Sequence, residues 1–203
     1  MRRLFLMLLS IMIFAVLAQE SSSMDNMRQK IAAKPSFLSK DFLSREEIIG
    51  VIQNAIDLNE DFKNALNKTE SEYREKRAEI EKYHEEVVAP MLKDLERLLS
   101  TGRDIDLIRD FFNLLISYEN SADERLSYTL GEIFLRNPNL INEAFYKLDK
   151  RKQKFIYNQL EWGFENVVYS TDKKSEQRIR DRYELLRYLK SMTGSNESKG
   201  VAP

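Results

Sequence analysis

Apolar side chains recur three or four residues apart along most of the chain, and this spacing constrains the fold more than any other feature. It places apolar side chains on one face of an α-helix, as with Ile48, Ile52 and Ile56 near the start of the pattern. No segment longer than four residues alternates between apolar and polar side chains as a half-buried strand does. The sequence therefore predicts an all-α fold with about seven helices.

Two arrangements of these helices are consistent with the pattern. Residues 44–102 predict a long, charged helical hairpin, because the apolar side chains between residues 70 and 99 are few and lie on a narrow face. Residues 104–192 predict a compact group of helices, in which the segment 105–118 is apolar around most of its circumference and should be buried on nearly all sides. We expect a multi-helix bundle, with a short α-solenoid of helix pairs as the alternative.

Local signals mark where helices begin and end. A Ser or Thr followed three residues later by Glu has the form of a capping box, and this pattern occurs at Ser44, Thr69 and Ser121. Pro90 lacks a backbone N–H and should kink or break the second helix, and Gly102 should end it.

The N-terminus has the pattern of a secretory signal peptide. Arg2 and Arg3 precede an apolar run over residues 4–17, and Ala18 completes a small-residue cleavage pattern. The alternative is an uncleaved membrane anchor, but the run is shorter than the roughly 20 apolar residues that span a bilayer. We therefore expect a periplasmic or secreted protein from which residues 1–18 are removed.

The remaining chain is short enough to form one domain. Residues 19–43 are polar and predict a flexible leader, residues 44–192 a single all-helical domain, and residues 193–203 a disordered tail. The chain has no Cys, which excludes disulfides, thiol chemistry and lipid attachment to cysteine.

Few residues are suited to catalysis or metal binding. The chain has one His, His84, in a Glu-x-x-His spacing with Glu81 that also occurs in carboxylate-bridged di-iron bundles. Such a site needs a second His, so we expect His84 to lie exposed on a charged surface. We predict no catalytic residue, metal site or cofactor and favour a non-enzymatic protein. A carboxylate-based hydrolase is the alternative and requires a cleft with a raised carboxyl pKa.

Charge is distributed unevenly along the chain. Residues 19–146 contain 17 basic and 25 acidic side chains, whereas residues 147–203 contain 13 basic and 8 acidic ones. The candidate binding residues in this C-terminal part are Lys147, Lys150, Arg151, Lys152, Lys154, Trp162, Arg178, Arg182 and Arg187. The alternatives are a solvated face for the cations and core packing for the tryptophan.

These observations lead to two hypotheses about function. The first is an exported adaptor or scaffold that contacts another protein of the extracytoplasmic compartment. The second is a module at the membrane or envelope surface that binds anionic lipid or polymer through its basic C-terminal helices. We do not expect a nucleic-acid partner, because the protein is expected to be exported.

Overall fold

The computed structural model describes residues 42–64, 69–119, 123–171 and 177–194, and every structural statement below refers to these residues. The expected signal peptide, most of the expected leader and the end of the expected tail lie outside them. Leu43 is buried, and its backbone N–H donates to the carboxylate of Asp94 at 3.0 Å. None of the described helices is both long and apolar enough to cross a membrane.

The described residues form helices and contain no strand, which confirms the predicted all-α class. Because α3, η2 and α4 follow one another without a break, the described residues form seven continuous helices, as the sequence predicts. The elements are α2 (Arg45–Asn64), α3 (Glu70–Tyr83), the π-helical segment η2 (His84–Val88), α4 (Ala89–Thr101), α5 (Ile105–Ser117), α6 (Arg125–Arg136), α7 (Pro138–Tyr146), α8 (Lys150–Thr171) and α9 (Gln177–Met192).

Two of the three expected capping boxes are present. At the start of α2, the Glu47 backbone N–H donates to the Ser44 hydroxyl at 3.2 Å, and the Ser44 N–H donates to the Glu47 carboxylate at 2.8 Å. Thr69 and Glu72 form the same reciprocal pair at the start of α3. Each box satisfies two backbone donors that the first helical turn leaves unpaired.

The third predicted box does not describe the start of α6. Ser121 lies outside the described residues, and Glu124 is the N-cap residue of α6 itself, without a capping bond from its side chain. Instead, the carboxylate of Asp123 accepts the backbone N–H of Arg125 at 2.9 Å. The helix therefore begins later than the sequence pattern indicates.

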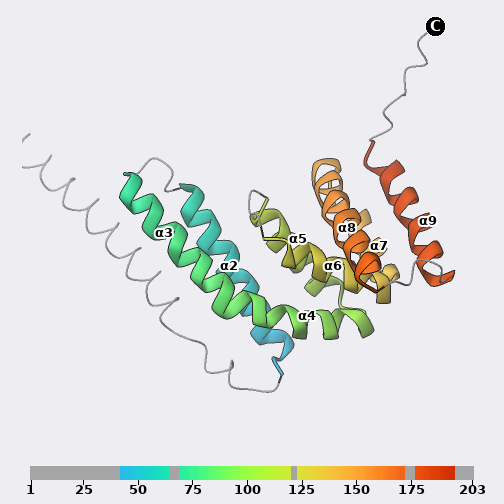
Figure 1. Ribbon diagram of the computed structural model, residues 1–203, viewed down its shortest axis with the longest axis horizontal. Coiled ribbons are helices and arrows are strands. Elements are labelled where there is room, and N and C mark those ends of the chain that lie inside the picture. Colours follow the sequence, from blue (N-terminus) through green and yellow to red (C-terminus); the bar gives the residue numbers. More distant parts are fainter. Residues whose placement is uncertain (1–41, 65–68, 120–122, 172–176, 195–203) are drawn as a thin grey trace, which may run out of the picture. The chain divides into compact units, whose positions relative to one another are not determined.

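The predicted kink at Pro90 is confirmed, and a π-helical turn accommodates it. In η2 the backbone N–H of Ala89 bonds to the carbonyl of His84, five residues earlier. Pro90 follows in the first turn of α4, and α3 and α4 run in different directions (Figure 1). Proline cannot donate to the carbonyl four residues earlier, and its ring collides with that carbonyl. The helix therefore forms a wider, π-helical turn at this point instead of ending.

The helices stack in two layers. One layer contains α2, α5 and α7, and the other contains α4, α6 and α8, each helix packing on the next one in its layer (Figure 1). The α6 and α8 interface is the most extensive of all, and α9 packs against α8. The described helices therefore form a multi-helix bundle, as the sequence predicts.

The core is richest around α5, α6 and α8. Only a narrow face of α5 is exposed, at Asp106, Arg109 and Asn113, which confirms that this helix is buried on nearly all sides. Phe134 of α6 and Phe164 of α8 meet edge to face, with their ring centroids 5.3 Å apart. Aromatic pairs in this geometry stabilise a core beyond the area that they bury.

Two glycines allow α6 and α8 to come into direct backbone contact, which the sequence analysis did not predict. An added Cβ on Gly131 of α6 would lie 2.6 Å from the backbone nitrogen of Phe164. An added Cβ on Gly163 of α8 would lie 2.6 Å from the carbonyl carbon of Ser127 and closer still to its oxygen. Beside this crossing, the Ser127 hydroxyl donates to the side-chain carbonyl of Gln159.

Candidate functional site

A groove of about 810 Å³ lies between α2, α3, η2 and the start of α6. Its walls combine aromatic rings with polar and charged side chains. Phe62 of α2 and Tyr73 of α3 contact each other with ring centroids 4.9 Å apart, and Tyr118 at the end of α5 packs on His84 at 5.0 Å. This volume is within the roughly 300 to 1,000 Å³ that small-molecule sites occupy.

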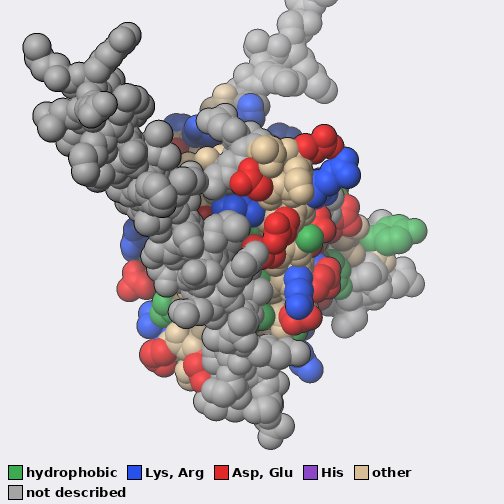
Figure 2. All heavy atoms as spheres, turned by 90° about the vertical axis from the view of Figure 1, so that its left-hand side faces the viewer, with side chains coloured by type: hydrophobic (Ala, Val, Ile, Leu, Met, Phe, Trp, Pro, Cys, Tyr) green, Lys and Arg blue, Asp and Glu red, His purple; other side chains and the backbone are tan. Residues whose placement is uncertain are grey.

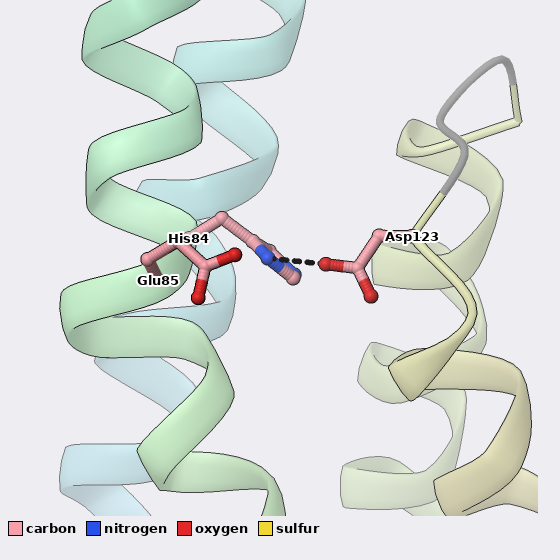
Figure 3. A group of neighbouring side chains, drawn as sticks. All are labelled: His84, Glu85 and Asp123. Carbon is pink, nitrogen blue, oxygen red and sulfur yellow. Dashed lines mark ion pairs between the residues drawn. The ribbon is translucent and has the colours of Figure 1, made fainter.

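At one wall of the groove, His84 is buried, so the expectation that this side chain is exposed is wrong. Its Nδ1 lies 2.7 Å from the carboxylate Oδ2 of Asp123, and the two side chains are 5% and 14% exposed (Figure 3). His84 shares the buried helix face of Tyr83, Val87 and Val88, whereas the neighbouring acidic residues point outward. The spacing of Tyr83, Val87 and Val88 places His84 on the apolar face of the helix and could have predicted its burial. The acidic residues next to it favoured the prediction of an exposed side chain.

Arg125 joins the two carboxylates beside the histidine. Its Nη1 donates to Glu85 at 2.8 Å, and its Nη2 approaches both Glu85 and Asp123 at 2.6 Å. Ligand atoms of His84, Glu85 and Asp123 lie within 4.8 Å of one another, a set of donors that a metal ion could use. The guanidinium of Arg125 already supplies one positive charge between the two carboxylates, so the cluster keeps one net negative charge when His84 is neutral.

The cluster shifts the ionisation of its members. Hydrogen bonding to Arg125 lowers the pKa of Glu85. Burial opposes ionisation of Asp123, but its bonds from Arg125 and the nearby His84 outweigh burial, and the pKa of Asp123 is lowered. Burial lowers the pKa of His84 more than the charge of Asp123 raises it. The histidine is therefore neutral at pH 7, and its Nδ1–H donates to Asp123, because a carboxylate can only accept.

The Asp123 and His84 pair bears on the hydrolase hypothesis. An Asp and His pair can act as a general base toward a side-chain hydroxyl or toward water. Ser117 lines the groove, yet its hydroxyl donates to the Leu114 carbonyl at 2.8 Å. The carboxyl pKa values of Asp123 and Glu85 are lowered, which is opposite to the raised value that the hydrolase hypothesis requires.

Near the groove, the surface of the hairpin carries both signs of charge. In Figure 2, which faces the α2 and α3 side of the molecule, acidic and basic side chains lie side by side over the coloured part of the surface. Arg77 pairs with Glu81 one turn away at 2.8 Å, and Arg74 pairs with Glu70 at 2.6 Å. The acidic excess of the N-terminal part is therefore interspersed with cations on this face.

A second candidate site lies where the ends of α7 and α9 meet the start of α8. Lys150 Nζ donates to the carbonyl of Met192 at 2.5 Å, and the hydroxyls of Tyr146 and Tyr188 bond to each other. The tyrosines are 46% and 50% exposed. We refer to the exposed residues Tyr146, Lys147, Lys150, Arg151, Lys152, Lys154, Arg187 and Tyr188 as the basic surface.

Three of the residues selected from the sequence do not belong to the basic surface. Trp162 is half-buried and lies eight residues beyond Lys154, about 12 Å along α8. Arg178 is exposed at the opposite end of α9. Arg182 is half-buried, and its Nε donates to the carbonyl of Leu135 at 3.3 Å, near the end of α6. Cations that are close in the sequence are therefore not all close in space, because α9 carries Arg178 and Arg182 away from the basic surface.

The fold and these sites define an all-helical protein of stacked helix pairs with a polar, aromatic groove and a separate basic surface. Comparisons with protein-family models, with curated proteins and with solved structures give no match. The function must therefore be argued from the residues of these two sites.

Proposed function

We propose that the protein is exported and acts as an adaptor or scaffold, contacting an acidic segment of another protein through its basic surface. The observation that carries this proposal is the exposed pair of Tyr146 and Tyr188, which lies within a group of cations from α8, α9 and the connection between α7 and α8. Exposed tyrosine and arginine are enriched at protein interfaces, where they supply much of the binding energy.

The start of α8 adds a second argument. Its first turn contains Lys150, Arg151 and Lys152 and no acidic residue. A cation at a helix N-terminus is unfavourable by about 0.3 to 1 kcal/mol, because the helix dipole is positive there. The nearby Asp149 is engaged in capping, accepting the backbone N–H of Lys152 at 2.9 Å. Three cations of the basic surface pair with neighbouring acids: Lys147 with Glu143, Arg151 with Glu119 and Arg187 with Glu184. The surface keeps an excess of positive charge that an acidic partner would complement.

The test is charge reversal with a matched control. The triple variant Arg151→Glu, Lys152→Glu and Lys154→Glu changes exposed residues of the basic surface and leaves the Lys150 bond intact. We expect it to lose partners that crosslink to the wild-type protein in the extracytoplasmic fraction, with affinity reduced at least about tenfold. If the same partners crosslink to this variant, or if wild type crosslinks to none, the proposal is wrong.

The control is the triple variant Lys93→Glu, Arg103→Glu and Arg109→Glu. It changes the net charge equally at exposed positions on α4, on α5 and between them, outside the basic surface. We expect it to retain the partner. Loss of the partner in both triple variants would show that net charge, and not the basic surface, governs binding.

Anionic lipid or envelope polymer is the second candidate for the same cations. Sedimentation with phosphatidylglycerol vesicles distinguishes it, since binding through exposed charges weakens at high salt. Vesicle binding by wild type at low salt that is lost in the basic-surface variant would favour this candidate over the protein partner. Export itself is tested by intact mass, and a mature protein that includes Met1 would contradict it.

A further inference from the structure

The groove beside His84 contains two buried polar atoms without a hydrogen-bond partner. They are Nδ2 of Asn59, in a residue 8% exposed, and Nε2 of His84, in a residue 4% exposed. Both residues line the groove. Leaving such an atom unpaired is unfavourable, so native proteins rarely bury one without a reason.

The two atoms differ in their hydrogen-bonding role, since one is a donor and the other an acceptor. The amide nitrogen of Asn59 is a donor. Two groups approach Nδ1 of His84: the carboxylate of Asp123 at 2.7 Å and Nη2 of Arg125 at 3.2 Å. The shorter contact is to a carboxylate and needs a proton on Nδ1, so the Nε2 of the neutral ring is an acceptor. The Asn59 side chain also lies near the hydroxyl of Tyr118. The groove wall thus contains one donor and one acceptor without a hydrogen bond of ordinary geometry, and hydroxyl groups of a ligand are able to satisfy them.

The charges of the groove do not require a charged ligand. Arg77 pairs with Glu81 at 2.8 Å, and Arg125 pairs with Glu85 and Asp123 at 2.6 Å. The two other charged groups of the lining, Lys63 and Glu124, have opposite signs. The charges therefore balance within the wall, apart from one excess carboxylate, and ligand selection depends on hydrogen bonds and ring faces.

Aromatic rings supply the apolar part of the wall. Phe62 and Tyr73 form one contact pair, and Tyr118 packs on the ring of His84. Flat ring faces beside donors and acceptors suit the C–H faces and hydroxyls of a sugar ring. A helical peptide would need a row of apolar anchors, which this mostly polar lining does not provide. An extended peptide would need a sheet edge, and the described residues contain no strand.

We infer that this groove binds an uncharged, hydroxylated small molecule, namely a short neutral saccharide, with the Asn59 amide and the His84 imidazole contacting its hydroxyls. This site is independent of the basic surface and of the protein contact proposed for that surface. The inference assigns recognition only.

The test is isothermal titration calorimetry of the full chain against cellobiose, maltotriose and chitotriose. We expect at least one of these to bind. Asn59→Ala and Tyr73→Leu should each weaken binding about tenfold, because they remove one polar contact and one ring face. The controls are Asn113→Ala and Tyr169→Leu, which remove exposed side chains outside the groove and should leave affinity unchanged.

Three results would overturn the inference. The first is that none of the three saccharides binds, and the second is that binding is equal in wild type and in both groove variants. The third is that a proline-rich peptide binds the groove more tightly and displaces the saccharide. Circular dichroism establishes that each variant is folded. The charge-reversed variant of the basic surface should retain saccharide binding, so failure of one proposal is distinguishable from failure of the other.

Discussion

Replacing Gly163 with alanine tests the backbone contact between α6 and α8. The added Cβ would lie 2.6 Å from the Ser127 carbonyl carbon, whereas ordinary contacts begin at 3.4 Å. The obstacle is the backbone of α6, so a change of side-chain rotamer does not relieve it. The two helices would have to separate by roughly 1 Å, which disturbs the most extensive helix interface in the described fold.

The expected loss of stability follows from this geometry. Overpacking a core costs about 1 to 3 kcal/mol, and a backbone clash belongs at the upper end of that range. For a chain of this size, a loss of about 3 kcal/mol lowers the melting temperature by roughly 6 to 12 °C. Urea unfolding followed by far-UV circular dichroism measures the free energy. The fluorescence of Trp162, the single tryptophan of the chain, reports on the adjacent interface.

Gly50→Ala is the matched control. Gly50 is exposed in α2, and an added Cβ there would meet nothing within 4 Å. Alanine should stabilise this helix by about 0.5 to 1 kcal/mol, because glycine loses more backbone entropy on folding. The reasoning is refuted if Gly163→Ala stays within about 0.5 kcal/mol of wild type, or if both variants are destabilised equally.

Two further predictions concern the buried histidine and the start of α5. Burial lowers the pKa of His84 in the folded protein below its ordinary value of 6.5, so the unfolded chain binds more protons as the pH falls. The free energy of unfolding is therefore unaffected by this histidine above pH 6.5 and decreases as the pH falls from 6.5 toward the folded-state pKa. Urea unfolding between pH 7.5 and 5.5 should show this decrease in wild type and a smaller one in His84→Gln; equal slopes would contradict it. Asp104→Ala should cost about 1 to 2 kcal/mol in the same assay, because Asp104 caps α5 at the Leu107 N–H, 3.0 Å away, and pairs with Arg45. Asp106→Ala, in the exposed first turn, is the control, and an equal effect there would show that capping is not the cause.

The helices and most of their boundaries could be predicted from the sequence, because their causes are local. Capping at Ser44 and Thr69 involves residues three positions apart, and Pro90 acts on the turn that precedes it. The third predicted helix start is wrong, because α6 begins at Arg125, whose backbone N–H donates to the carboxylate of Asp123.

The sites could be predicted only in part. The cations at 147–154 are adjacent in sequence, so composition alone identifies them. Their association with Tyr188 depends on α9 packing antiparallel to α8, and the same packing carries Arg178 to the other end of the helix. Spacing along the chain does not specify the direction in which a later helix returns.

The sequence by itself was enough to establish an all-α fold of about seven helices, because periodicity of apolar residues and helix capping are short-range effects. The burial of His84 against Asp123, and the contact of Gly131 with Gly163, join residues more than thirty positions apart. Such pairs form only when whole helices pack, since side-chain volume and backbone approach are properties of an interface between elements. The groove and the basic surface therefore exist only in the folded arrangement of these helices.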